Sequence, residues 1–313
     1  MKRKDRRKKK SMTKILLLLL VLIIGVIVYV FLNQKQADKK AENSVANIAS
    51  KEKNTVSKNS SEKKVLLSKD ENHLPILMYH YVTSNSDELP QDSNNIDIVA
   101  FENQLKALKE NNYKTVSAAE AQQLLTKKEK LDNKLVWLTF DDGSVTMYTR
   151  IFPLLKKYNM HATSFIITDY VNNGQGGILT WDQIKEMKES GLVDFGSHTA
   201  QHFDLGLQTA EQQQEELLKS KSDLDKELNQ NTDMICYPAG GYNQDTLNIA
   251  DKLGYKFGVL DPGRNGAIES DAKESDGLLM LPRYRMLDTT TPNDLLKMLE
   301  QSTVYNTENT IEK

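Results

Sequence analysis

The feature that most constrains the fold is a regular alternation of two periodicities between residues 74 and about 300. Short apolar runs typical of buried strands are followed by segments with helical spacing. This alternation indicates parallel βα units, because each parallel strand needs a crossover that returns the chain to the same end of the sheet. We predict strands at residues 76–80, 135–140, 162–167, 193–197, 234–237 and 256–259, and a weaker one at 279–281.

The intervening segments have the marks of helices. Phe101, Leu105 and Leu108 share one helical face, Thr180 is placed as an N-cap, and residues 208–228 form a long polar helix pattern. Strands buried on both faces and each followed by a helix favour a distorted (β/α) barrel with fewer than eight strands. An open, doubly wound sheet is the alternative. In a barrel, reactive side chains are expected just after the strands, at one mouth.

The N-terminal end predicts a membrane anchor. Residues 1–14 carry nine Lys or Arg against one acid, and residues 15–32 then contain neither charge nor proline. A run of this length can span the hydrocarbon core, and the basic flank places residues 1–14 in the cytoplasm and the rest outside the cell membrane. A cleaved signal peptide is the rival interpretation, but no small-x-small cleavage site follows the run.

Composition then bounds the remaining chain. Residues 33–72 are rich in Lys, Asn, Ser and Glu and predict a disordered spacer before a catalytic domain at 73–300 and a polar tail at 301–313. Beyond residue 14 the chain keeps 32 of its 41 basic and 42 of its 43 acidic residues, so it should not bind nucleic acid. Cys236 is the only cysteine, which excludes a disulfide framework.

Two adjacent carboxylates, Asp141 and Asp142, follow the predicted strand 135–140 and precede Gly143. Because two neighbouring carboxylates cannot hold one cation with the same geometry, we expect one to ligate a metal and the other to act as a base. The alternative is that an aspartate merely caps a helix after Ser144.

A histidine pair, His198 and His202, follows the predicted strand 193–197. Two imidazoles four positions apart can converge on one ion, and their nitrogens suit zinc, nickel or cobalt. With Asp142 they would supply two nitrogens and one oxygen. Such a set leaves coordination positions open for water and substrate, as a catalytic centre requires.

The sequence Thr-Phe-Asp-Asp-Gly at 139–143, followed by His-Thr-Ala-Gln-His at 198–202, resembles the polysaccharide deacetylases of carbohydrate esterase family four, the NodB homology domain. This resemblance implies that Asp141 is the catalytic base and that Asp142, His198 and His202 bind the metal. It also implies a distorted (β/α) barrel.

Residues 237–243 are similar to the third motif of that family, Arg-x-Pro-Tyr, whose loop backbone helps hold the oxyanion. The resemblance makes Pro238, Ala239 and Tyr242 oxyanion or substrate-binding residues, with the Ala239 N–H as the donor. Cys236 or Tyr237 occupies the position where the family commonly has the arginine that orients the base, so Arg283 or Arg285 is expected to orient Asp141 instead. The alternative is an ordinary Pro-Gly turn.

The late Leu-x-His motif of the family is absent, because no histidine follows His202. The segment Leu-Met-Tyr-His at 77–80 instead resembles the start of the circularly permuted poly-N-acetylglucosamine deacetylases, which assigns the general acid to His80. Asp261, after the last firm strand, is expected to orient His80.

These residues together predict a metal-dependent hydrolase, most simply a zinc enzyme. It would remove N-acetyl groups from a poly-N-acetylglucosamine-like polymer or peptidoglycan and release acetate. An O-acetyl esterase acting on a wall polysaccharide and a non-catalytic carbohydrate-binding wall protein are the alternatives. We expect a monomer whose partners are the polysaccharide and the membrane.

Overall fold

A computed structural model describes residues 71–84, 94–126 and 134–308 of the chain. The predicted basic head and membrane span, and the spacer up to residue 70, lie outside these ranges. Within them, no helix combines the length and the apolar character needed to cross a bilayer.

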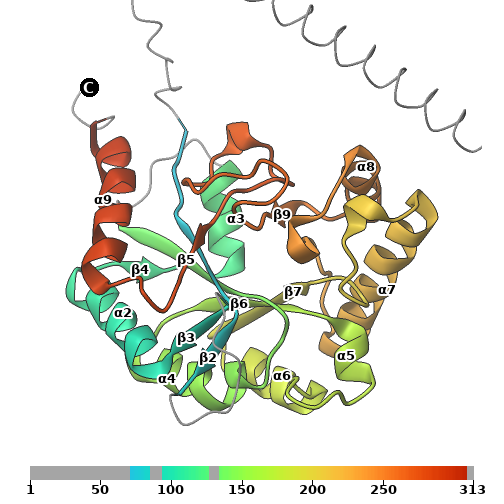
Figure 1. Cartoon of the computed structure of the whole chain (residues 1–313), viewed down its shortest axis with the longest axis horizontal. Coiled ribbons are helices and arrows are strands. Elements are labelled where there is room, and N and C mark those ends of the chain that lie inside the picture. The colour runs from blue at the N-terminus through green and yellow to red at the C-terminus, as the bar shows by residue number, and fades with distance from the viewer. Residues whose placement is uncertain (1–70, 85–93, 127–133, 309–313) are drawn as a thin grey trace, which may run out of the picture. The chain divides into compact units, whose positions relative to one another are not determined.

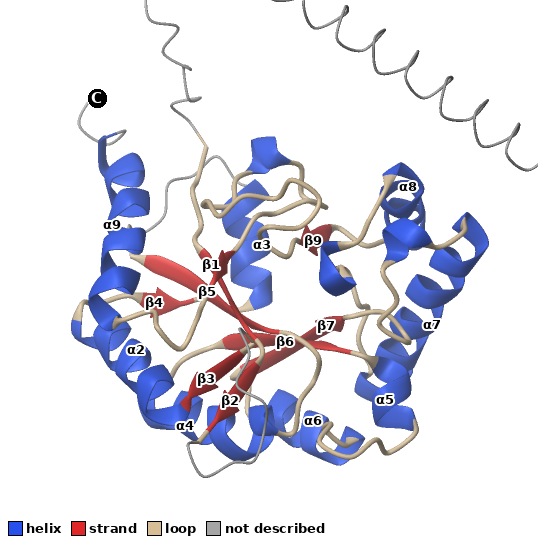
Figure 2. Cartoon of the chain, viewed as in Figure 1, coloured by secondary structure: helices blue, strands red, loops and turns tan. Residues whose placement is uncertain are grey.

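A curled sheet of parallel strands lies at the centre of this domain, with helices around it (Figures 1 and 2). Its main path runs β10-β1-β5-β6-β7-β8-β9, and β4 pairs with the first residues of β5. The strands are β1 (Ile76–Tyr79), β4 (Lys114–Thr115), β5 (Leu135–Phe140), β6 (Ala162–Ile166), β7 (Val193–Ser197), β8 (Met234–Cys236), β9 (Phe257–Val259) and β10 (Tyr284–Arg285). A separate parallel pair joins β2 (Tyr81–Thr83) to β3 (Asn95–Asp97). The curled parallel sheet confirms the α/β class and is consistent with the distorted barrel.

The weak strand predicted at 279–281 is wrong as a strand, but the segment has a role in curling the sheet. Leu281 makes an isolated parallel bridge to Val259 of β9, and the Leu281 N–H donates to the carbonyl of Gly258 at 2.8 Å. A few residues later, Tyr284 pairs with Leu77 of β1. The chain therefore passes from one edge of the sheet to the other within this segment, with too few consecutive pairs to form a longer strand.

Helices cover the outside of the sheet and agree with the predicted patterns. They are α2 (Ile98–Glu110), α3 (Ala118–Thr126), α4 (Phe152–Tyr158), α5 (Thr168–Asn172), α6 (Trp181–Glu189), α7 (Ala210–Leu228), α8 (Gln244–Leu253) and α9 (Pro292–Glu308). Thr180 caps α6 through a capping box, as predicted. The long polar helix begins two residues later than expected, because Thr209 is its N-cap. The last helix crosses the boundary predicted at residue 300.

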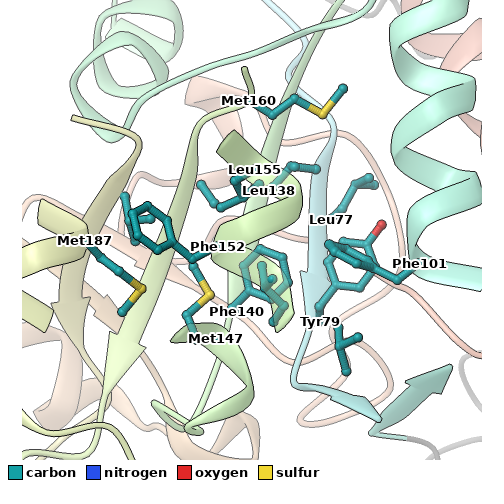
Figure 3. Packing of buried hydrophobic residues seen from close by; sticks show 14 of the residues in the cluster. Leu77, Tyr79, Phe101, Leu138, Phe140, Met147, Phe152, Leu155, Met160 and Met187 are labelled. Atoms are coloured by element: carbon teal, nitrogen blue, oxygen red, sulfur yellow. The ribbon is translucent and has the colours of Figure 1, made fainter. Parts of the chain in front are cut away.

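The core lies on both faces of the strands. Along β5, Val136, Leu138 and Phe140 pack outward into a cluster shared with the covering helices, whereas Trp137 packs into a second cluster on the other face. Figure 3 shows Phe101 of α2 beside Tyr79 and Phe140; the Phe101 ring lies edge-on to both, with ring centroids 5.3 and 5.9 Å apart. Each such buried side chain contributes about 1.5–3 kcal/mol to the stability of the fold.

Because the strands are parallel, their carboxyl ends meet at one edge. His80, Asp141 and His198 each follow directly after a strand, β1, β5 and β7 respectively, and Tyr237 follows β8. Residues that are far apart in the sequence are thereby brought to one mouth.

Candidate metal centre and active site

A pocket of about 240 Å³ opens at the carboxyl end of the sheet. It is lined by His80, Asn94, Asp141, Asp142, His198, His202, Tyr237, Ala239, Asp261, Arg264 and Arg285. All five of the residues that the sequence assigned to catalysis or metal binding are in this set. The fold therefore brings together the side chains that the motifs only suggested.

Three potential metal donors converge inside the pocket. Oδ1 of Asp142 lies 3.3 Å from Nε2 of His198 and 3.4 Å from Nε2 of His202, and the two imidazole centroids are 4.8 Å apart. The donor atoms all lie within 4.8 Å of one another. Two imidazole nitrogens and one carboxylate oxygen at this separation fit a divalent transition metal with open coordination positions.

The backbone around these donors is strained. Asp142, Thr199 and His202 have φ values of 70°, 63° and 64°, a region that non-glycine residues seldom occupy. Such conformations cost on the order of 1–3 kcal/mol each and persist where the surrounding structure enforces them. The helical turn after Asp142 begins only near Met147, with Thr146 as its N-cap, so neither aspartate caps it.

Two outer contacts orient the donors. Nδ1 of His198 bonds to the carbonyl of Cys236 at 2.8 Å, which leaves Nε2 directed at Asp142. The Tyr81 hydroxyl donates to Oδ2 of Asp142, so Oδ1 is the oxygen that faces both histidines. Second contacts of this kind fix the tautomer of a ligand and the direction of its lone pairs.

We therefore expect Tyr81→Phe to weaken metal affinity by roughly 10- to 100-fold, because Asp142 loses the bond that fixes its rotamer. Competition against a chromophoric chelator measures this affinity without any enzyme assay. Tyr148→Phe is a matched control, since Tyr148 bonds to Glu186 on the surface instead. An unchanged affinity in Tyr81→Phe would remove this role from the hydroxyl.

Asp141 is held in a different way. The carboxylate is 3% exposed, and Arg283, which is fully buried, donates to its two oxygens at 2.9 and 2.8 Å. Burial alone would raise the pKa of Asp141, but the charge and hydrogen bonds of Arg283 outweigh it and lower that pKa to about 2. Asp141 is therefore a charged carboxylate at neutral pH, available to accept a proton.

A second donor set, Asp141, His198 and Cys236, also lies within 4.8 Å. It fits a metal poorly, because both Asp141 oxygens already accept from Arg283 and burial raises the pKa of the Cys236 thiol. The thiol instead sits 3.3 Å from Oδ2 of Asp141.

His80 lines the same pocket as the metal donors. Its Nε2 is 3.9 Å from Oδ2 of Asp141, and burial lowers the pKa of the imidazole despite the two nearby carboxylates. Asp261, predicted to orient His80, lines the same pocket and is ion-paired with Arg285. Of the two candidate arginines, Arg283 therefore contacts Asp141 and Arg285 contacts Asp261.

The loop after β8 places its three predicted residues differently. Ala239 lines the pocket with a φ of 50°. Pro238 is buried in the turn beside it. Tyr242 lines a different cavity of about 530 Å³, which Tyr284 also lines. Of the three, only Ala239 lines the catalytic pocket.

Three residues of the site carried no sequence signal: Tyr81, which bonds to Asp142, and Asn94 and Arg264, which line the pocket. Tyr81 stands next to His80 but belongs to no motif, and Asn94 is brought in by the β2–β3 pair, where it accepts from Arg285 at 3.0 Å. Arg264 reaches the pocket from the loop after β9.

Comparison with known proteins decides the family. Residues 128–258 match the sequence profile of a family described as polysaccharide deacetylase. A putative polysaccharide deacetylase of Bacillus subtilis (strain 168), YxkH, is 40% identical over 215 residues, which cover 68% of this chain and 71% of that protein. The chain belongs to the polysaccharide deacetylase family. It is accordingly a hydrolase that acts on N-acetyl amide bonds.

Further relatives and solved structures are also deacetylases or resemble this domain in fold. The solved structure of the Streptococcus pyogenes deacetylase PplD in complex with acetate is 38% identical, covers 73% of this chain and 99% of that one, and has a TM-score of 0.68. IcaB from Ammonifex degensii is 25% identical with a TM-score of 0.62, covering 74% and 97%. A poly-beta-1,6-N-acetyl-D-glucosamine N-deacetylase of Staphylococcus aureus (strain N315) is 32% identical over 57% of this chain, which spans 64% of that relative.

Proposed function

We propose that this deacetylase removes N-acetyl groups from N-acetylglucosamine residues of a poly-N-acetylglucosamine-like polysaccharide, with the help of one divalent metal, and releases acetate. One observation carries the proposal: Asp142, His198 and His202 converge on one point beside the ionised, arginine-paired Asp141. A metal site with open coordination positions and an ionised carboxylate beside it fits hydrolysis.

The residues of the chain divide the work of amide hydrolysis. Asp142, His198 and His202 would hold the metal, which when bound polarises the acetyl carbonyl and lowers the pKa of water beside it. Asp141, kept ionised by Arg283, accepts a proton from the attacking water. The Ala239 N–H stabilises the negative charge that develops on the acetyl oxygen. His80 donates a proton to the departing sugar nitrogen, so that the C–N bond breaks to give acetate and a free amine.

The donor set favours zinc as the metal. Zinc accepts imidazole nitrogen and carboxylate oxygen in a catalytic site with an open position, and nickel or cobalt would also be accommodated. The proposal also includes the location of the enzyme. The apolar run at 15–32 would anchor it, as a monomer, in the cell membrane with its catalytic domain outside.

The choice of polymer rests on two supports. The S. aureus relative is named for action on poly-beta-1,6-N-acetyl-D-glucosamine. His80 follows the first strand of the sheet and reaches the mouth there, as the resemblance to the circularly permuted deacetylases of that polymer requires. Peptidoglycan is the second candidate substrate.

Product analysis tests the proposal. The chain is incubated with β-1,6-linked N-acetylglucosamine oligomers, with peptidoglycan and with an O-acetylated xylan, and acetate and new amine are both quantified. Equal amounts of acetate and amine from the N-acetylglucosamine oligomers are expected. Acetate without amine, from the xylan only, would make the enzyme an esterase, and no acetate from any polymer would leave a binding protein.

A further inference from the structure

Two exposed apolar side chains closely follow the metal donor His202 in the sequence. Among the residues whose side chains the structure describes, five large hydrophobic side chains are exposed, and two of them, Phe203 at 44% and Leu207 at 82%, fall in one short segment. That segment begins directly after His202, which lines the catalytic pocket. Single exposed apolar residues are ordinary, but a pair within five positions of a metal donor needs an explanation.

The segment that carries this apolar ledge, defined as Phe203 and Leu207, is firmly built. Leu205, between them, is fully buried in a core cluster. The Asp204 side chain accepts from the Gly206 N–H at 3.0 Å, and the Asp204 carbonyl accepts from the Leu207 N–H at 3.2 Å. The exposure of the ledge is thus imposed by a fixed turn, which directs one apolar residue inward and two outward.

This turn also packs against the loop that lines the pocket. A Cβ on Gly241 would lie 1.8 Å from Oδ1 of Asp204, so only glycine allows the two loops to approach this closely. Gly241 is two residues from Ala239, which faces the pocket. The turn that carries the ledge therefore packs against the loop that carries Ala239, and it begins directly after His202, so it lies next to two segments that line the pocket.

The size of the catalytic pocket implies that a polymer continues beyond it. At about 240 Å³ it is smaller than the 300–1,000 Å³ typical of sites that enclose a drug-sized ligand, so it cannot enclose a polymer. The next unit of a polysaccharide must lie on the rim. Pyranose rings have apolar C–H faces, which pack favourably on aromatic and aliphatic side chains.

We propose that the apolar ledge is a second sugar subsite, which binds the unit adjacent to the one that loses its acetyl group. The proposal rests on the polysaccharide N-deacetylase function proposed above and assigns to Phe203 and Leu207 the positioning of the polymer. The ledge makes no contact with the reacting atoms, so its contribution falls on substrate binding.

Steady-state kinetics on a β-1,6-linked N-acetylglucosamine pentamer test the subsite. Phe203→Ala is expected to lower kcat/KM roughly tenfold, mainly by raising KM, because it removes most of the apolar contact between the Phe203 ring and the bound sugar. Phe203→Trp should restore activity. Leu218→Ala is the matched control, since Leu218 is 45% exposed on α7, and it should match the wild type.

Metal affinity is measured on the same proteins, because Phe203 neighbours His202. Equal affinities are expected; a loss of affinity that parallels the loss of activity would overturn the subsite and leave only a distorted ligand loop. Equal kinetics for Phe203→Ala and Leu218→Ala would also overturn it. Loss of vesicle binding by Phe203→Ala with unchanged pentamer kinetics would overturn it in favour of a lipid surface. If the wild-type enzyme is inactive on the pentamer, that result contradicts the proposed function itself, and with it the subsite.

Discussion

An Asp141→Asn variant should bind metal as the wild type does and lose about 10²- to 10⁴-fold in the rate of acetate release. The amide has nearly the shape of the carboxylate, but it cannot accept a proton from water. Asp142, His198 and His202 are unchanged, so the metal donors stay in place. Acetate release from the pentamer and metal affinity by chelator competition are the two measurements.

This variant also removes the charge that faces Arg283. Its folding must therefore be established by circular dichroism at the assay temperature, and the double variant Asp141→Asn/Arg283→Met, which removes both charges, provides a better-folded comparison. Activity of a folded Asp141→Asn protein within threefold of the wild type would show that Asp141 is not the base.

Replacing Arg283 by methionine should destabilise the fold by about 3–5 kcal/mol, because it leaves Asp141 charged and buried without a partner. Arg283 is fully buried and Asp141 is 3% exposed, so solvent cannot take over the role of the guanidinium. Urea denaturation of the metal-free protein measures the loss. Arg285→Met is the matched control, since Arg285 lies two residues away at the more open mouth and should cost less.

The pH dependence of this loss has a definite sign. In the wild type the pKa of Asp141 is lowered to about 2, so its ionisation contributes stability that is present above pH about 4 and is lost as the pH falls toward 2. In Arg283→Met the largest influence that lowers this pKa is gone and burial raises it, so the folded variant keeps the proton on Asp141 above pH about 4 and loses stability as the pH rises from there toward the raised pKa.

The difference in unfolding free energy between wild type and Arg283→Met should therefore narrow as the pH falls from 7 toward 4. A difference that is constant over this range would mean that the variant loses packing rather than charge compensation. A stability equal to that of the wild type at pH 7 would contradict the buried ion pair altogether.

Much of the site could be predicted because its residues follow strands. Asp141, His198 and His80 are marked by apolar runs that end just before them, and parallel pairing then brings the ends of β5, β7 and β1 together. No knowledge of distances was needed for that step, since the topology alone puts these positions at one edge.

The partners of those residues could not be predicted in the same way. Arg283 and Arg285 are two positions apart and so point to the same side of an extended chain; only the depth at which each lies decides that one reaches Asp141 and the other Asp261. Tyr81 bonds to Asp142 across 61 residues of sequence. Such contacts depend on the register of β1, β5 and β10, which periodicity does not encode.

The strand predicted at 279–281 failed for a related reason. An apolar run shows that a segment is buried, but it does not show that both neighbours offer consecutive pairing partners. Here the segment crosses between β9 and β1 and makes a single bridge.

The central claim, that Asp142, His198 and His202 hold a metal on which deacetylation depends, is tested most directly by removing and restoring that metal. The protein is stripped with a chelator, and acetate release from the pentamer is followed while zinc is added back. We predict that activity falls to background and returns in proportion to metal, with saturation at one equivalent per chain for the wild type and no recovery for His198→Ala. Undiminished acetate release from the metal-free protein, or full recovery in His198→Ala, would contradict the account.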